Sequence, residues 1–414
     1  MHVMAKPVGP ICNLNCEYCF YTEKTALFPN RHTYRMSETL LDRYVKEYID
    51  SEKTPEILFT WQGGEPTLAG LEFFKKAVKL QKKYAAGKRI CNSLQTNGTL
   101  LNNEWCRFLK ANNFLVGISL DGPEHIHDRH RVDRKGKPTF SRVMNGLALL
   151  QKHQVEYNVL SSVSREASAH PREIYRFLKK SGVRFIQFTP IVERKPDANA
   201  IALGLRHGMP HVSNKQLPES SDMTPWSVAP EPYGEFLIQI FDEWVRNDVG
   251  DIFVMNFEWS LASWMGLPST ICIFSKACGE SVIIEQNGDI YSCDHFVYPR
   301  YRLGGITDSR LIDIVESAAH REFGAVKEKT LSSECKNCEV RFACHGGCPK
   351  HRFLMSPNGE PGLNYLCEGY KKYLFHIHRY MKVMRQLIEN GLPVAKVMEV
   401  AKGAILAVNL PDVN

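Results

Sequence analysis

The grouping of the cysteines constrains this chain more than any other feature of its sequence. Thirteen cysteines are spread over 414 residues, and eleven of them fall into three groups. The groups are Cys12, Cys16 and Cys19; Cys272, Cys278 and Cys293; and Cys335, Cys338, Cys344, Cys348 and Cys367. Because disulfides are disfavoured in reducing compartments, grouped cysteines in a chain without an export signal indicate metal binding or redox chemistry.

The composition indicates a soluble protein, which we expect to be cytoplasmic. Hydrophobic residues make up 43% of the chain and charged residues 23%, as in ordinary globular proteins. No apolar run approaches the roughly 20 residues that span a bilayer, and the N-terminus lacks the apolar stretch of a signal peptide. The net charge of +7 includes no run of five or more Lys and Arg. We therefore expect no membrane partner and no nucleic-acid partner.

The first half of the chain alternates strand and helix patterns. Strands are predicted over residues 3–8, 57–62, 89–95, 115–120, 157–163 and 185–190. Helices are predicted over residues 37–51, 71–84, 102–112, 140–153, 171–181 and 235–246. This alternation is typical of βαβ units and a parallel sheet, and six units predict an α/β fold with a partial (β/α)6 barrel rather than the closed eight-unit form.

Three segments follow from the pattern: a barrel over residues 1–250, a cysteine-rich domain over 251–370 and closing helices over 371–414. Within the first, residues 193–232 are rich in Pro, Ser, His and Gly and too long for an ordinary connection. A lid, a substrate-facing loop and a surface insertion all remain possible interpretations. In the second, residues 282–292 resemble a hairpin that turns at Asn287-Gly288.

The first cysteine group has the spacing Cys12-x3-Cys16-x2-Cys19 and directly follows the first predicted strand. Three thiolates on one short loop can hold three irons of a cubane cluster and leave the fourth iron open to another ligand. A structural zinc site is the alternative, but it would need a fourth ligand nearby, and no histidine has convincing spacing.

Together with Phe20 and Tyr21, this motif resembles the signature of the radical S-adenosylmethionine (SAM) superfamily. The resemblance implies a [4Fe-4S] cluster whose open iron binds SAM, followed by reductive cleavage to a 5′-deoxyadenosyl radical. It also implies that Tyr21 lies against the adenine and that Val192, after the sixth strand, lines the adenine pocket.

Residues at the ends of other strands fit the same resemblance. Gln62-Gly-Gly-Glu-Pro66 is similar to the glycine-rich segment that receives the amino group of SAM, and Gly64 permits a close backbone approach. Ser119 ends the fourth strand, and Arg131 in the following loop is a candidate partner for the methionyl carboxylate. The nearby His125, His127 and His130 are mixed with charged residues, which favours solvated or substrate-facing histidines over a metal site.

The eight cysteines of the second half are enough for two fully ligated cubane clusters, with two four-thiolate zinc sites as the alternative. Residues from about 270 to 370 are similar to the SPASM domain of radical SAM enzymes. The resemblance assigns Cys272, Cys278, Cys293 and Cys348 to one auxiliary cluster, and Cys335, Cys338, Cys344 and Cys367 to the other. With every position filled, electron transfer is the expected role of both, so the chain is expected to hold three [4Fe-4S] clusters.

The whole pattern resembles the anaerobic sulfatase-maturating enzymes, which oxidise a Cys or Ser residue of a sulfatase to Cα-formylglycine. The resemblance implies that Asp294, directly after Cys293, is the base. An anionic cluster beside it is expected to raise the pKa of this carboxyl. The expected partners are an unfolded sulfatase polypeptide with a Cys/Ser-x-Pro/Ala-x-Arg motif and an external low-potential electron donor.

Two other functions remain open at this point. A different SPASM enzyme would form thioether or carbon–carbon crosslinks in a precursor peptide. Such enzymes often carry a peptide-binding domain at one terminus, and no such segment is expected here. A zinc or electron-transfer protein without enzymatic activity is the remaining alternative.

Overall fold

The structure, a computed structural model, describes residues 1–28, 34–211 and 221–403. The strands are β1 (His2–Ala5), β2 (Glu56–Trp61), β3 (Arg89–Thr96), β4 (Phe114–Ser119), β5 (Tyr157–Val163), β6 (Phe185–Pro190), β7 (Phe253–Val254), β8 (Ser281–Ile284), β9 (Asp289–Tyr291), β10 (Arg302–Gly305), β11 (Leu354–Met355) and β12 (Pro361–Leu363). The α-helices are α1 (Glu38–Ser51), α2 (Leu71–Tyr84), α3 (Asn103–Ala111), α4 (Glu124–His127), α5 (Phe140–Lys152), α6 (Pro171–Lys180), α7 (Ala198–Ala202), α8 (Pro230–Asn247), α9 (Met255–Trp264), α10 (Leu311–Val315), α11 (Ala318–Lys329), α12 (Ser333–Lys336), α13 (Arg341–Cys344), α14 (Cys367–Glu389) and α15 (Val397–Ala401). No helix among these residues is long and apolar enough to cross a bilayer.

In the described part of the chain, ten strands form one sheet in the order β10-β9-β8-β1-β2-β3-β4-β5-β6-β7. Strands β1 to β6 pair in sequence order and in parallel, which confirms the predicted six βα units. The short strand β7 also pairs in parallel with β6, so the barrel sheet continues beyond residue 250, where the first segment was predicted to end.

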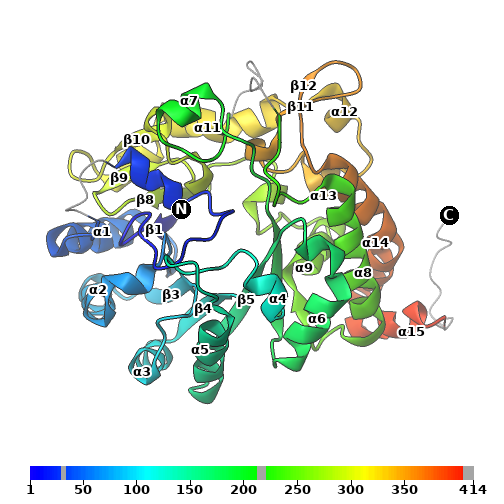
Figure 1. Cartoon of the computed structure of the whole chain (residues 1–414), viewed down its shortest axis with the longest axis horizontal. Coiled ribbons are helices and arrows are strands. Elements are labelled where there is room, and N and C mark those ends of the chain that lie inside the picture. Colours follow the sequence, from blue (N-terminus) through cyan, green and yellow to red (C-terminus); the bar gives the residue numbers. More distant parts are fainter. Residues whose placement is uncertain (29–33, 212–220, 404–414) are drawn as a thin grey trace.

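The helices of the barrel lie outside the sheet because each has one apolar face (Figure 1). In α1, Tyr44 is fully buried and packs edge-on against Trp61 of β2, with ring centroids 6.0 Å apart. The ring centroid of Phe74 in α2 lies 5.6 Å from the centroid of the same indole. The helix α1 begins where the Ser37 hydroxyl accepts a hydrogen bond from the amide of Leu40, so Ser37 is its N-cap.

The cysteine-rich segment extends the barrel sheet. Strand β8 pairs in parallel with β1, and β9 then folds back antiparallel to β8. The turn between them contains Gly288, whose φ of +89° suits a glycine, as the predicted hairpin requires. Cys293 and Asp294 follow shortly after β9, which ends at Tyr291, and Asp294 comes near Lys6, the residue after β1.

Two glycines allow the closing helix α14 to pack along α8 (Figure 1). A Cβ on Gly234 of α8 would lie 2.5 Å from the backbone oxygen of Gly369 in α14. A Cβ on Gly369 would lie 2.0 Å from the backbone oxygen of Pro230. The two backbones are therefore closer than any larger side chain permits, and the closing segment is fixed to the last helix of the barrel.

The described parts of the 193–232 insertion are attached to the rest of the molecule, whereas residues 212–220 lie outside the described residues. Its base is closed by backbone hydrogen bonds from Thr224 to Glu193 and from Val228 to Ile191. The buried Glu23, just after the first cysteine motif, accepts hydrogen bonds from Arg206 and His207 of the insertion.

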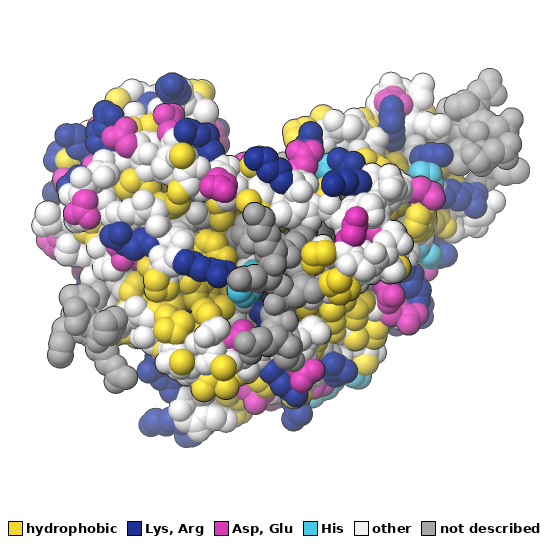
Figure 2. Space-filling model, turned by 90° about the horizontal axis from the view of Figure 1, so that it is seen from above, with side chains coloured by type: hydrophobic (Ala, Val, Ile, Leu, Met, Phe, Trp, Pro, Cys, Tyr) yellow, Lys and Arg dark blue, Asp and Glu magenta, His cyan; other side chains and the backbone are white. Residues whose placement is uncertain are grey.

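Seen from above, the molecule has two lobes with an indentation between them (Figure 2). Hydrophobic side chains gather on both sides of the centre of this face (Figure 2).

Candidate active site

A cavity of about 350 Å³ is lined by residues that follow the barrel strands and by residues of the cysteine-rich segment. The carboxyl ends of parallel strands are where α/β folds bind ligands. The barrel side of the cavity includes Cys12, Cys16, Cys19, Tyr21, Gly64, Ser119 and Arg131. The cysteine-rich segment contributes Asp294, His295, Lys350 and His351 to the lining. The cavity thus joins the first cysteine motif and Asp294, which are far apart in sequence.

The three cysteines of the first motif line this cavity as free thiols, with Cys12 and Cys16 buried. Burial raises the pKa of both thiols to about 12, so neither would ionise at neutral pH without a bound cation. The amide of Leu14 lies 3.3 Å from the sulfur of Cys12, and the side-chain amide of Asn97 lies 3.8 Å from it. Both contacts stabilise a thiolate, which is the form that a cluster iron needs.

Gly64 occupies a position in the cavity wall that no other residue could fill. A Cβ at this position would lie 2.1 Å from the backbone oxygen of Ile11, just before the first cysteine. The next residue, Glu65, is fully buried and accepts hydrogen bonds from Thr67, Thr96 and the amide of Asn97. This carboxylate ties the loop after β2 to the loop after β3, so the glycine-rich segment is held against the cysteine loop.

Arg131 reaches the cavity on a buried ion pair. Its Nε lies 2.8 Å from Oδ2 of Asp121, and Nη2 donates to the hydroxyl of Ser162 at 3.2 Å. Tyr18 donates its hydroxyl to the same oxygen of Asp121 at 2.6 Å. Burial alone would raise the pKa of the Asp121 carboxyl, but the adjacent guanidinium lowers it below its ordinary value. The arrangement fixes a cationic side chain in the wall, next to Ser119.

The two remaining predicted SAM contacts differ in their placement. Tyr21 lines the cavity, with its hydroxyl donated to Glu285 at 2.5 Å and the ammonium of Lys6 at 4.5 Å from its ring centroid. Val192 packs in the hydrophobic core and does not line the cavity, whereas its neighbours Ile191 and Glu193 do. The strand ended as predicted, but the alternation of side chains at its end turns Val192 inward.

The eight cysteines of the second half gather in two places. The first place holds Cys272, Cys278, Cys293 and Cys348. Burial raises the pKa of the Cys293 thiol there, and the nearby Asp294, Cys348 and Cys272 raise this pKa further. The pKa of Cys278 is raised to about 11 by burial, with Cys348 again among its neighbours. The second group lines a separate hollow and consists of Cys335, Cys338, Cys344 and Cys367.

The donor sets fit iron–sulfur clusters. Each of the two groups brings four thiols together, and the first motif brings three, as cubane clusters with and without an open iron require. Cys106, which belongs to no group, is buried in the apolar core, and Cys91 lies in β3. Cys91 is only partly buried.

Asp294 lies at the wall of the cavity beside the thiol of Cys293, with 3.5 Å between its Oδ1 and the sulfur. Burial raises the pKa of its carboxyl, but His295, Lys6 and Lys350 outweigh that effect, so the pKa is lowered. The sequence had predicted a raised pKa from cluster charge alone. His295 is the next residue in the sequence, whereas Lys6 and Lys350 come from distant segments that the local sequence of Asp294 does not indicate.

Sequence reasoning also missed an ion pair across the cavity wall. Lys350, two residues after Cys348, pairs with Glu193 at the start of the insertion, and both side chains are at most 8% exposed. The same ammonium lies 4.4 Å from the ring centroid of Phe20, next to Cys19. Lys350 therefore contacts the first motif and the insertion at once. No motif surrounds Glu193 or Lys350, so only their spatial proximity could have identified them.

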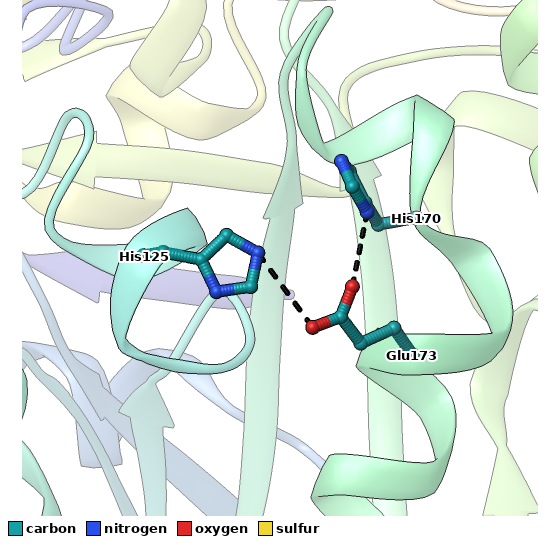
Figure 3. A group of neighbouring side chains, drawn as sticks. All are labelled: His125, His170 and Glu173. Atoms are coloured by element: carbon teal, nitrogen blue, oxygen red, sulfur yellow. Dashed lines mark hydrogen bonds and ion pairs between the residues drawn. The ribbon is translucent and has the colours of Figure 1, made fainter.

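The three histidines after β4 separate in the structure. His127 is fully buried and hydrogen-bonds Thr139, while His130 lies between the carboxylates of Glu17 and Glu166. His125 is exposed and lies near His170 and Glu173 (Figure 3). The three do not converge on one metal ion.

The chain matches two family models. The radical SAM superfamily matches residues 7–178, and the SPASM iron–sulfur cluster-binding domain matches residues 272–339. The serine-type anaerobic sulfatase-maturating enzyme of Bacteroides thetaiotaomicron is 44% identical over 99% of this chain and 97% of its own length. The cysteine-type enzyme of Clostridium novyi is 32% identical over 90% of this chain and 94% of its own.

Solved structures similar to this chain include an anaerobic sulfatase-maturating enzyme. Native anSMEcpe with bound AdoMet and Cp18Cys peptide is 31% identical to this chain, with a TM-score of 0.79 over 94% of this chain and 99% of that one. Streptococcus suis SuiB bound to precursor peptide SuiA is 14% identical, with a TM-score of 0.58 over 88% and 75% of the two chains, and shows a common fold alone. The radical SAM and SPASM resemblance predicted from the motifs is confirmed.

Proposed function

Because this chain belongs to the anaerobic sulfatase-maturating enzymes of the radical SAM superfamily, we propose that it oxidises a Ser or Cys residue of a sulfatase polypeptide to Cα-formylglycine. The observation that carries the proposal is that one cavity is lined both by the first cysteine motif and by Asp294. A target residue inserted there would meet the cofactor on one side and a carboxylate on the other.

Three [4Fe-4S] clusters are proposed. Cys12, Cys16 and Cys19 hold the first; Cys272, Cys278, Cys293 and Cys348 the second; and Cys335, Cys338, Cys344 and Cys367 the third. When bound, these clusters and SAM supply the 5′-deoxyadenosyl radical that removes a Cβ hydrogen and the acceptor for the electron that leaves the target.

The barrel residues hold SAM in this proposal. The guanidinium of Arg131, oriented by Asp121, binds the methionyl carboxylate through charge-assisted hydrogen bonds. Gly64 lets its segment approach the amino group, and Ser119 adds a hydroxyl to the same wall. Tyr21 is held by Glu285 where its ring faces the cavity and contacts the adenine. The apolar wall after β6 is supplied by Ile191.

Asp294 is the proposed base. Oxidation of a Ser target to the aldehyde removes a Cβ hydrogen atom, the hydroxyl proton and one electron. The same losses from a Cys target give a thioaldehyde, which water converts to the aldehyde with release of hydrogen sulfide. The cations around Asp294 keep its carboxylate ionised, so it can accept that proton. Lys350 and His295 line the same wall and stabilise the anionic form of Asp294 before the proton arrives.

The proposed substrate is an unfolded sulfatase segment with the motif Cys/Ser-x-Pro/Ala-x-Arg, modified in the cytoplasm before any export. We further propose Ser as the preferred target, since the relatives of serine type are 35–44% identical to this chain and those of cysteine type 32–33%. An external low-potential carrier supplies the electron that cleaves SAM.

The test uses anaerobically reconstituted enzyme, SAM, a reductant and two peptides that differ only in a Ser or Cys at the motif. Formation of the aldehyde is followed by mass spectrometry and hydrazide trapping, and 5′-deoxyadenosine by chromatography. We expect Asp294→Asn to slow aldehyde formation by about 100-fold or more while 5′-deoxyadenosine still forms. If the wild type leaves both peptides intact, sulfatase maturation is wrong; if Asp294→Asn matches the wild type, another group is the base.

A further inference from the structure

His125, His170 and Glu173 form a compact group on the surface, and none of them lines the cavity (Figure 3). His125 belongs to α4, His170 directly precedes α6, and Glu173 lies in the first turn of α6. Nε2 of His125 lies 3.6 Å from one oxygen of Glu173, and Nδ1 of His170 lies 3.0 Å from the other. Each carboxylate oxygen thus faces a different imidazole, and both imidazoles are exposed to solvent.

The supports of this group are rigid. On either side of Gly122, Ile126 of α4 and Ile174 of α6 are buried, and a Cβ on that glycine would lie 3.6 Å and 3.0 Å from them. His127 anchors α4 further by its hydrogen bond to Thr139 at 3.2 Å. Because the neighbours of His125 and Glu173 are packed in the core, the exposed side chains extend from fixed backbones and lose little freedom when they bind a ligand.

The donor types and their spacing suit a transition-metal ion. Two imidazole nitrogens and a carboxylate oxygen are ligands that Zn²⁺ and Ni²⁺ accept at bonds of about 2.1 Å. Donors at such distances, separated by angles of about 90–110°, lie roughly 3.0–3.4 Å apart. The three donor atoms here lie within 4.8 Å of one another, so small rotations about the side-chain bonds would bring them to one ion. A surface ion pair alone explains only one of the two histidines beside the carboxylate.

We propose that His125, His170 and Glu173 bind one divalent first-row transition-metal ion, of the Zn²⁺ or Ni²⁺ class, with water in the remaining positions. The ion would link α4 to α6 on the outside of the barrel. On the inside, the amide of Ser162 in β5 donates to Asp121 at 2.9 Å and ties the segment after β4 to the strand that leads towards α6. The bound ion is thus a second clamp on the part of the barrel that carries Arg131. It stabilises the folded protein by mass action.

The test is a calorimetric titration of the anaerobic, cluster-loaded protein with NiCl₂. Iron content is measured before and after, so that displacement from the clusters is recognised. We expect one equivalent to bind to the wild type, and affinity to fall by more than about tenfold in His170→Ala and in Glu173→Gln. His153→Ala is the control, because His153 is an exposed histidine with its own partner, Asn103 at 2.8 Å, and its loss should change nothing.

A second readout distinguishes the clamp from incidental binding. Amide hydrogen exchange in residues 124–131 and 171–175 should slow when Ni²⁺ is added to the wild type, and should not respond in Glu173→Gln. The three residues are exposed, so these variants should keep the iron content and melting temperature of the wild type. The absence of a Ni²⁺ site in the wild type, equal affinity in the variants, or binding without an effect on exchange would each overturn the proposal.

Discussion

The guanidinium of Arg131 and the carboxylate of Asp121 form a buried ion pair, with 2.8 Å between Nε and Oδ2. Asp121 lies two residues after β4, and Arg131 lies ten residues further along the same connection, after α4. The pair folds this loop back on itself so that the arginine reaches the cavity. The carboxylate also accepts a hydrogen bond from the amide of Ser162, which joins the segment after β4 to strand β5.

Asp121→Asn should weaken SAM binding by at least about tenfold, since Arg131 would lose the charge that orients it. Equilibrium dialysis with radiolabelled SAM on the cluster-loaded protein measures the change. Arg142→Ala is the control, because it breaks the more exposed pair with Asp133 at 3.2 Å. Unchanged SAM affinity in Asp121→Asn, with full iron content, would contradict the assigned role of Arg131.

Cys335→Ala should lower the iron content by about four atoms per chain and leave the other two clusters in place. Cys335 and its three neighbours line their own hollow, apart from the main cavity. Iron analysis and electron paramagnetic resonance of the reduced protein check the result. Cys91→Ala, a change outside the groups, should keep all the iron. Equal iron in both variants would rule out Cys335 as a ligand.

Glu285 predicts a pH dependence of stability. Burial raises the pKa of its carboxyl to about 7, although Tyr21 and Lys6 partly oppose the shift. Between its ordinary pKa of 4.5 and about 7, the folded protein binds more protons at this site than the unfolded chain does. The contribution of the Glu285 carboxyl to the free energy of unfolding is therefore complete below pH 4.5. It falls by on the order of 3 kcal/mol as the pH rises through the folded-state pKa of about 7.

The check is anaerobic denaturant unfolding of wild type and Glu285→Gln at several pH values between about 5 and 8. Glutamine keeps an acceptor for the Tyr21 hydroxyl but does not titrate. The difference in free energy of unfolding between variant and wild type should grow in favour of the variant as pH rises. Parallel pH profiles for the two proteins would show that Glu285 is already ionised at low pH.

Gly234→Ala should destabilise the protein by about 1–3 kcal/mol through overpacking between α8 and α14. Helix propensity alone would give the opposite sign, since alanine is favoured over glycine inside a helix by about 1 kcal/mol. The melting temperature of the cluster-loaded protein measures the net effect. Gln239→Ala, on the same helix, should be nearly neutral. A stabilised Gly234→Ala would mean that the two helices separate easily.

The sequence was most informative where the structure is local. The six βα units were predicted because strand and helix periods are properties of short windows, and β5 and β6 begin and end where predicted. The hairpin around Gly288 followed from turn chemistry in the same way. The pairing of β8 with β1 could not be predicted, because it joins residues almost 280 positions apart and leaves no periodic signal.

The site shows the same division. Motif spacing suggested the cysteines as candidates, and the superfamily resemblance at strand ends suggested Gly64 and Arg131. The ion pair between Glu193 and Lys350 depends on how the cysteine-rich segment meets the barrel, as do the cations that lower the pKa of Asp294. Val192 was placed in the cavity by its position after β6, but the backbone there turns Ile191 towards the cavity instead.

The most direct test of formylglycine formation uses a peptide whose motif Ser carries deuterium at Cβ. We predict that the peptide loses one Cβ deuterium and the hydroxyl hydrogen to give an aldehyde, and that one deuterium appears in 5′-deoxyadenosine for each aldehyde formed. Deuterium-free 5′-deoxyadenosine with an intact peptide, or label transfer that leads to a crosslink rather than an aldehyde, would contradict the account.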